Sequence, residues 1–324
     1  ETMLGGDVPE LPSDPKESLE ILAEVALANQ QNGDHPRYFA RVPSPSSYAS
    51  ILGEWLGTGF NAIATSWGGG SGTTAVELIV IDWLKQLLGL PETHEGVLLS
   101  GGSMANITAF SVARNQKGIG RVYYNDQMHS SLQRGLRELG FGEDNLCQID
   151  SDNLLKMPVD VLRDSIERDL SNNLQPMMVI ATAGTTNTGG VDPLHAIADL
   201  CEQHNLWFHV DGAYGLPTTI TKQGHDYLDG FSRADSLVLD PHKWFFQPYE
   251  SGCLLVKHQG ALQACFDMNP EYLKDVQAQN SEVDMRNRSL ELTRSARGLK
   301  LWMSLRTYGA EKFRGGIEHG IQLA

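Results

Sequence analysis

Four side chains that could take part in chemistry come shortly after short apolar runs of the sequence. They are Ser103 after GVLL, His129 after RVYYN, Asp211 at the end of LWFHV and Lys243 after SLVL. Apolar runs separated by helical patterns are typical of parallel strands, whose carboxyl ends lie at one edge of a sheet. We therefore expect the four side chains to meet at that edge.

Each of these side chains also has an ordinary structural explanation. A glycine turn into a helix, as in SGGSMAN at 100–106, is usually only a connection. A lone Asp211 usually caps a turn or helix, although it could also bind a metal or pair with a cationic ring nitrogen. His129 could cap the following helix, be a structural histidine or stack on a planar cofactor. Taken singly, these positions leave the chemistry open.

Lys243 is the most informative of the four because most of its neighbours are apolar. It lies in LDPHKWFF at 239–246. Taking an ammonium group out of water costs several kcal/mol unless it is paired or deprotonated. One explanation is a structural lysine held by a salt bridge. The other is a Schiff-base lysine, whose amine attacks a carbonyl group.

Together the four side chains match what pyridoxal 5'-phosphate (PLP) requires. Gly101, Gly102 and Ser103 begin a helix whose free N–H groups suit a phosphate. Asp211 would keep the pyridine nitrogen protonated, and Lys243 would hold the cofactor as an imine. A metal site is disfavoured because the sequence has no HExxH and no paired His/Asp cluster. A nicotinamide site would need GxGxxG after a strand, which SGGSMAN does not provide.

The elements that must position these residues alternate along the chain. Ser13 or Asp14 can cap a helix that has Pro15 in its first turn, and a helical pattern from residue 73 ends at Gly89 and Pro91. From residue 96 onward, helical segments separate the apolar runs GVLLS, RVYYN, LCQI, MMVIATAG, LWFHVDGA, SLVLD and SGCLLVK. We expect an α/β fold with a mostly parallel sheet and helices on both faces.

The composition argues against polyanionic partners. The 324 residues include 25 Lys and Arg against 40 Asp and Glu, a net charge of −15, so nucleic acid and anionic membranes are not expected to bind. The four cysteines have no metal-binding spacing and are expected to be reduced, which suits the cytoplasm. No secretory signal and no run long enough to span a bilayer is visible.

Six motifs occur along the chain in an order and spacing that resemble a known family. They are HPRYFARVPSPSSY, SGGSMAN, HSS, AGTTNTGGVDP, HVDGAY and DPHKW. The family is the group II PLP-dependent amino-acid decarboxylases, and the nearest branch is the aromatic-L-amino-acid decarboxylases. The resemblance covers essentially the whole chain. It implies fold type I, which is aspartate-aminotransferase-like, and a homodimer whose active sites lie at the interface.

The resemblance assigns roles to individual residues. Lys243 matches the Schiff-base lysine, Asp211 the partner of the pyridine nitrogen, and His129 the histidine stacked on the cofactor ring. The remaining positions that match the cofactor site are Gly102, Ser103, Thr186, Asp240 and His242. Asp240 stands where some members have asparagine. Because an acid there would repel the phosphate, we expect Asp240 to be turned away or hydrogen-bonded by a donor such as His242.

The substrate pocket matches the aromatic branch only in part. Ser44 stands where that branch has a substrate-contacting threonine, and Ile63 matches a residue that the partner subunit supplies. Arg41, Val42 and Thr65 occupy positions where the branch has aromatic side chains near the substrate. We expect an aromatic amino acid as substrate, and the alternative is an acidic or other non-aromatic one that Arg41 could reach.

Tyr272, in NPEYLKD, matches a tyrosine on a mobile loop that closes over the substrate in this family. The polar segment that follows, up to Arg286, suits such a lid. Members that form aldehydes carry phenylalanine at this position, so Tyr272 favours an amine as product. An aldehyde-forming oxidative decarboxylase and a catalytically silent scaffold remain as alternatives.

The resemblance also predicts how the chain is divided. We expect an N-terminal helical segment and substrate loop at 1–60 and a PLP-binding large domain at 61–312. Residues 313–324 would begin a C-terminal small domain that lies beyond this sequence. Family members also extend further at the N-terminus.

Overall fold

The computed structural model describes residues 4–38, 42, 44–268 and 282–324. The chain divides into two compact units, 1–41 and 42–324. In the first, Asp14 caps helix α1 (Pro15–Ile21) by accepting a hydrogen bond of 2.7 Å from the Lys16 N–H. Of the two predicted caps, Asp14 is thus the one that is used. The predicted domain boundaries at 60 and 312 remain predictions.

A seven-stranded sheet forms the centre of the second unit, in the order β1-β7-β6-β5-β4-β2-β3. Its strands are β1 (Glu95–Leu99), β2 (Arg121–Asn125), β3 (Leu146–Ile149), β4 (Pro176–Thr182), β5 (Trp207–Asp211), β6 (Ser236–Leu239) and β7 (Gly252–Val256). Strand β7 runs antiparallel to both of its neighbours, and the other pairs are parallel. The predicted mostly parallel sheet is therefore confirmed.

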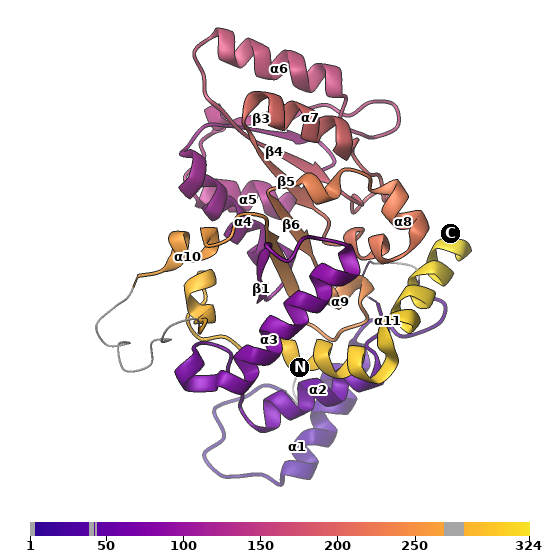
Figure 1. The fold of residues 1–324 in the computed structure, drawn as a ribbon. Coiled ribbons are helices and arrows are strands. Elements are labelled where there is room, and N and C mark those ends of the chain that lie inside the picture. Colours follow the sequence, from indigo (N-terminus) through magenta and orange to yellow (C-terminus); the bar gives the residue numbers. More distant parts are fainter. Residues whose placement is uncertain (1–3, 39–41, 43, 269–281) are drawn as a thin grey trace. The chain divides into compact units, whose positions relative to one another are not determined.

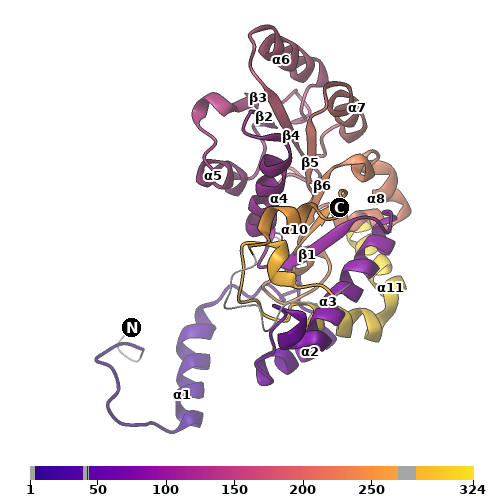
Figure 2. The same cartoon turned by 60° about the vertical axis from the view of Figure 1, so that its left-hand side comes forward.

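Helices cover both faces of this sheet (Figures 1 and 2). The helices of the second unit are α2 (Tyr48–Gly59), α3 (Trp67–Leu88), α4 (Gly102–Lys117), α5 (Ser130–Glu138), α6 (Val159–Ser171), α7 (Leu194–His204), α8 (Lys222–Tyr227), α9 (Pro241–Trp244), α10 (Ala261–Phe266) and α11 (Gly298–Leu323). Figure 2 shows α4, α5 and α10 on one side of the sheet and α3, α7 and α8 on the other. One continuous apolar core joins these layers.

Helix α3 begins six residues before the position predicted from its apolar pattern. Ser66 caps it by accepting a hydrogen bond of 3.2 Å from the Gly69 N–H. Gly70 then breaks the helical backbone with φ −167° and ψ 60°. The glycine-rich first turn has no apolar periodicity, which is why the sequence pattern begins only at residue 73.

The parallel strands bring the predicted site segments to one edge of the sheet. The segments after β1, β2, β4, β5 and β6 all leave the sheet at its carboxyl edge, because these five strands share one direction.

Among the described residues, no helix combines the length and apolar character needed to cross a membrane.

Candidate active site

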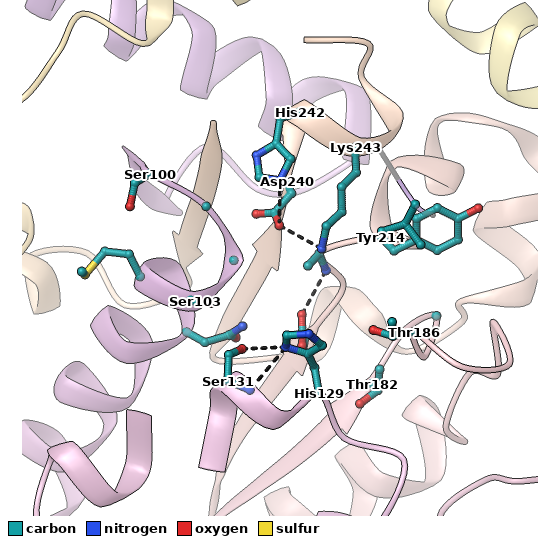
Figure 3. Close-up of a pocket in the computed structure, with 18 of the residues that line it drawn as sticks. Ser100, Ser103, His129, Ser131, Thr182, Thr186, Tyr214, Asp240, His242 and Lys243 are labelled. Atoms are coloured by element: carbon teal, nitrogen blue, oxygen red, sulfur yellow. Dashed lines mark hydrogen bonds and ion pairs between the residues drawn. The ribbon is translucent and has the colours of Figure 1, made fainter. Parts of the chain in front are cut away.

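A cavity of about 390 Å³ lies at the carboxyl edge of the sheet, a size that suits a small ligand. Ser103, His129, Asp211 and Lys243 all line it. Figure 3 shows Lys243, Asp240 and His242 on one side of this cavity, with His129 and Ser131 on the opposite side. The structure thus brings together the four side chains that the sequence places after separate strands.

The turn before helix α4 forms one wall of the cavity. Gly101 has φ 153°, a backbone conformation that favours glycine, and no side chain caps the helix that follows it. A Cβ atom on Gly102 would lie 2.8 Å from Asp240 Oδ2, so only glycine allows this close approach. The first N–H groups of α4 are therefore available to an anionic group in the cavity.

Lys243 is held by Asp240, three residues earlier. Its Nζ lies 3.0 Å from Asp240 Oδ2, and the Asp240 side chain is only 2% exposed. The other carboxylate oxygen, Oδ1, is buried and has no hydrogen-bond partner in the part of the chain that the structure describes. The Ser44 hydroxyl donates a hydrogen bond to the Lys243 backbone carbonyl. Asp240 is thus the ion-pair partner of Lys243. A salt bridge was one of the two explanations for this lysine, but its partner was not predicted.

His242 lies beside the same carboxylate. Its Nδ1 accepts a hydrogen bond of 3.1 Å from the Ser251 N–H, so the proton of the neutral ring is on Nε2. That nitrogen lies 3.6 Å from Asp240 Oδ2, beyond hydrogen-bond distance, so the hydrogen bond that we expected from His242 to Asp240 is not formed. Burial lowers the pKa of His242, which favours this neutral form.

Asp211 ends strand β5 and is 5% exposed. Its Oδ1 accepts a hydrogen bond of 3.1 Å from the Ala213 N–H. Among the described residues, no basic side chain forms an ion pair with it, and burial raises the pKa of its carboxyl group. The Lys243 charge offsets this burial only in part. A buried carboxylate without an ion-pair partner is unfavourable, so this position suits a cationic group of a ligand.

His129 is both a helix cap and a wall of the cavity. Its Nδ1 lies 2.8 Å from Ser131 Oγ and accepts a hydrogen bond of 3.4 Å from the Ser131 N–H, at the start of helix α5. It also lines the cavity, together with Thr186. The cap uses only the ring nitrogen Nδ1, so the structural role of His129 does not exclude stacking on a ligand.

The predicted substrate residues are only partly gathered at this cavity. Val42 lines it, and Ser44 lies behind Lys243. Ile63 forms a β-bridge with Ser295, and the Thr65 carbonyl accepts a hydrogen bond of 2.8 Å from the Arg286 N–H. Neither Ile63 nor Thr65 is among the residues that line the cavity. Arg41 and Tyr272 lie outside the described residues.

Several lining residues were not singled out from the sequence. They are Ser100, Met104, Asn106, Ser131, Thr182, Ala213, Tyr214 and Tyr249. Asn106 follows Ser103 by three residues and so lies on the same helix face, a spacing that could have indicated it. The Tyr214 ring stacks on Trp244, with centroids 4.9 Å apart, a contact that sequence spacing does not predict.

These features fit PLP. The uncapped start of α4 suits its phosphate, the unpaired Asp211 suits a protonated ring nitrogen, and the Lys243 amine faces the same cavity. Among the described residues, no three His, Cys, Asp or Glu side chains are grouped so that they could hold a metal ion.

Known proteins resemble the chain over nearly its whole length. The model of the pyridoxal-dependent decarboxylase conserved domain matches residues 5–324. The chain is 43% identical to the aromatic-L-amino-acid decarboxylase of Bacillus atrophaeus, over 98% of this chain and 67% of that protein. It is 34% identical to the phenylacetaldehyde synthase of Arabidopsis thaliana, over 99% of this chain and 69% of that protein.

A solved structure shows the same architecture. The crystal structure of Oryza sativa TDC with PLP and tryptamine matches with a TM-score of 0.91 at 29% sequence identity. The match covers 96% of this chain and 68% of that one, so the chain spans about two thirds of each of these proteins.

Proposed function

Because the chain belongs to the pyridoxal-dependent decarboxylase family, we propose that it is a carboxy-lyase that converts an L-amino acid into its amine and carbon dioxide. The cofactor of this family is PLP, and when bound its ring takes up the electron pair left at Cα as carbon dioxide departs. One observation carries the proposal: the Lys243 amine and the buried, unpaired Asp211 carboxylate line the same cavity.

The residues around the cavity have different roles in this proposal. Lys243 would hold the cofactor covalently, and Asp211 would keep the proton on its ring nitrogen. Gly102 and Ser103, at the start of α4, would bind its phosphate, and His129, at the start of α5, would stack on its ring. Asp240 orients the Lys243 amine through their 3.0 Å ion pair.

The substrate in this proposal is an aromatic amino acid. Relatives named for aromatic amino acids or their products support it, as does the hydroxyl that Ser44 keeps. A specific observation favours the acidic alternative. Arg41 and Thr65 replace aromatic residues of the branch, and an arginine would suit a carboxylate side chain. The ratio of kcat/KM between phenylalanine, tyrosine, tryptophan, glutamate and aspartate decides between these two classes.

A panel of these amino acids with PLP-loaded protein, with carbon dioxide and amine measured together, tests the proposal as a whole. Equal molar amounts of amine and carbon dioxide are expected from one class of substrate. A PLP-loaded protein that releases carbon dioxide from none of the amino acids would instead support the silent scaffold. Lys243→Arg is the matched control, because it keeps the charge beside Asp240 and removes the amine.

Tyr272 decides between amine and aldehyde in this proposal. After carbon dioxide leaves, Cα must gain a proton before oxygen reacts with it, and a phenol can donate that proton. A general acid of this kind contributes roughly 10²–10⁴-fold in rate. Tyr272→Phe should therefore still release carbon dioxide but form aldehyde, ammonia and peroxide in place of amine.

Simultaneous assays of carbon dioxide, amine and peroxide check this prediction. Wild-type protein that forms as much peroxide as carbon dioxide would be an aldehyde synthase, like the Arabidopsis relative by name. An unchanged amine yield in Tyr272→Phe would remove this residue from the mechanism.

The active species in this proposal is a homodimer whose partner subunit completes the substrate pocket. Ile63 and Thr65 do not line the cavity of their own chain, in the part that is described. Helix α2 and its C-cap also expose the large apolar side chains Tyr48, Trp55 and Phe60, at 70%, 66% and 77%. Exposed apolar surface of this kind commonly marks an interface.

Complementation between two inactive variants tests the dimer. Lys243→Arg lacks the amine, and Ile63→Asp places a charge where the partner's substrate would bind. If active sites are shared between subunits, mixing the two unfolded variants and refolding them should restore part of the activity. If each chain is self-sufficient, the mixture will remain inactive.

We also propose a cytoplasmic location. All four cysteines are free thiols: Cys201 and Cys253 are buried, and Cys147 and Cys265 are partly buried. Reduced cysteines of this kind are typical of a reducing compartment.

A further inference from the structure

A line of four buried polar side chains runs from the candidate active site into the core of the sheet. Asn106 of α4 lines the cavity, and its Oδ1 lies 2.7 Å from His209 Nε2 on β5. His209 Nδ1 lies 2.7 Å from Ser236 Oγ on β6. The Trp207 indole N–H donates to the same Ser236 oxygen at 2.8 Å. All four side chains are 2% exposed or less, so water cannot replace these partners.

Only one assignment of donors and acceptors along this line satisfies every polar group. Trp207 can only donate, so Ser236 accepts from it. The remaining neighbour of the Ser236 hydroxyl is His209 Nδ1, so the hydroxyl proton must go to that nitrogen. In the opposite arrangement, Ser236 would receive two donors and its own buried O–H would have no acceptor, which costs about 1–3 kcal/mol.

His209 is therefore the neutral tautomer with its proton on Nε2. Complete burial lowers its pKa to about 3, so the ring stays neutral at any ordinary working pH. The edge-to-face contact with Phe110, at a centroid distance of 5.1 Å, holds the ring in place. Its Nε2–H donates to Asn106, and the Asn106 carbonyl oxygen is consequently occupied on the side away from the cavity.

The other half of the Asn106 amide has no such partner. Asn106 is 1% exposed, and none of the described residues forms a hydrogen bond with its NH₂ group. Asn106 lies one helical turn after Ser103 on α4. His209 is two positions before Asp211 on β5, so the side chains of His209 and Asp211 face the same side of that strand. The amide therefore presents a donor to the cavity that also contains Asp211, Ser103 and Lys243.

We propose that Asn106 donates a hydrogen bond to the bound cofactor, and that His209 is the positioning residue that keeps the amide NH₂ turned toward it. This inference rests on the proposed function, because the acceptor is an oxygen of PLP. A carbonyl oxygen turned into the cavity would repel the same acceptor. The orientation set by Trp207, Ser236 and His209 therefore determines whether Asn106 attracts or repels the cofactor.

The first experiment determines which imidazole nitrogen of His209 carries the proton in the wild-type apoprotein. Long-range ¹H–¹⁵N NMR of the His209 imidazole at neutral pH should show the neutral ring protonated on Nε2. A proton on Nδ1, or a charged ring, would overturn the argument. This measurement requires neither a variant nor bound cofactor.

The second experiment measures the dissociation constant of PLP by titrating apoprotein and following absorbance. Asn106→Leu and His209→Leu should each weaken PLP binding about tenfold, the value of one good hydrogen bond. His209→Gln retains an N–H that can donate to Asn106, so it should stay within about threefold of wild type. Phe110→Leu is the matched control: it removes packing from the same helix face and the same ring but no hydrogen bond. It should lower the melting temperature of the apoprotein without changing PLP affinity.

The outcomes separate this inference from the proposed function. If wild-type protein does not bind PLP, the proposed function fails, and the role of Asn106 fails with it. If wild-type protein binds PLP but Asn106→Leu binds equally well, only the inference is overturned. If His209→Leu and His209→Gln weaken binding equally, or if Phe110→Leu weakens it as much as they do, His209 is structural and not a positioning residue.

Discussion

The Glu77–Arg294 pair and the charges around Lys243 are both buried within the second unit, but they are built differently. Both side chains of the first pair are 0% exposed, and Arg294 Nη2 and Nη1 lie 2.6 and 3.1 Å from the two Glu77 carboxylate oxygens. Glu77 also accepts a hydrogen bond of 2.9 Å from the Leu98 N–H, and Arg294 donates to two backbone carbonyls. Arg294 Nε is buried without a hydrogen-bond partner among the described residues, but the charge of the group is compensated by Glu77.

The charged groups around Lys243 lack some of their partners. Among the described residues, Asp211 forms no ion pair, although the Lys243 charge partly offsets its burial, and one oxygen of Asp240 has no hydrogen-bond partner. The Lys243 side chain is 21% exposed. Closed networks of buried charge hold a structure together, because each charge is compensated within the protein. A network in which buried charges or polar atoms lack partners lowers the free energy of unfolding and implies a ligand that supplies those partners. The two regions therefore predict opposite responses to substitution.

The largest effect is expected from Lys243→Arg. The guanidinium group keeps the pairing with Asp240 but stays protonated and cannot attack a carbonyl. Carbon dioxide release should fall by roughly 10⁴-fold or more, the cost of losing a covalent nucleophile. The free energy of unfolding should change by less than about 1 kcal/mol, as is usual for a substitution that preserves contacts.

Borohydride reduction locates the covalent link in the same proteins. Wild-type protein loaded with PLP should carry the cofactor on the peptide that contains Lys243, and Lys243→Arg should carry none. A label on another peptide would move the active lysine elsewhere.

The next effect is expected in the closed pair. Glu77→Gln removes the nearest counter-charge of the buried Arg294, whose other carboxylate, Glu291, lies 3.9 Å away, and should lower the free energy of unfolding by about 3–5 kcal/mol. Urea denaturation measures this change. The double variant Glu77→Leu/Arg294→Met should recover most of the loss, because it leaves no buried charge uncompensated. A loss below about 1 kcal/mol in the single variant would show that the pair is not structurally important.

Asp211→Asn should have effects of opposite sign on stability and on cofactor binding. In the apoprotein it removes a buried unpaired carboxylate and should raise the free energy of unfolding at neutral pH by about 1 kcal/mol. In the PLP-bound protein it removes the charge that holds the ring nitrogen, and the affinity for PLP should fall at least tenfold. A variant that is both less stable without cofactor and normal in PLP affinity would identify Asp211 as an ordinary turn residue.

The smallest expected effect is the pH dependence of that stability difference. Burial raises the pKa of Asp211 in the folded apoprotein above the ordinary value of 3.8, so ionisation of this carboxyl group disfavours folding. The advantage of the Asp211→Asn variant should be absent near pH 3.8 and grow as the pH rises through the raised pKa. Unfolding curves of both apoproteins between pH 4 and 8 measure it. An advantage that does not change with pH would require a cause other than ionisation.

Local sequence patterns predicted most of the architecture, because the alternation of apolar runs and helices depends on neighbouring residues. The cap at Asp14, the runs that became β1–β7 and the gathering of Ser103, His129, Asp211 and Lys243 at one edge all follow from such patterns. The start of α3 was placed too late, since its glycine-rich first turn lacks apolar periodicity.

Residue order and the direction of the parallel strands are enough to predict which chemical groups are present and at which strand ends they lie. How those groups are paired depends on packing in three dimensions and cannot be predicted from residue order. The contact of Asn106 with His209 joins residues 103 positions apart, and that of Glu77 with Arg294 joins residues 217 positions apart. Even Asp240 and Lys243 face each other only because Pro241 begins a helical turn between them. Pairing requires side chains to approach within hydrogen-bond distance, and packing between helices and the sheet sets that distance.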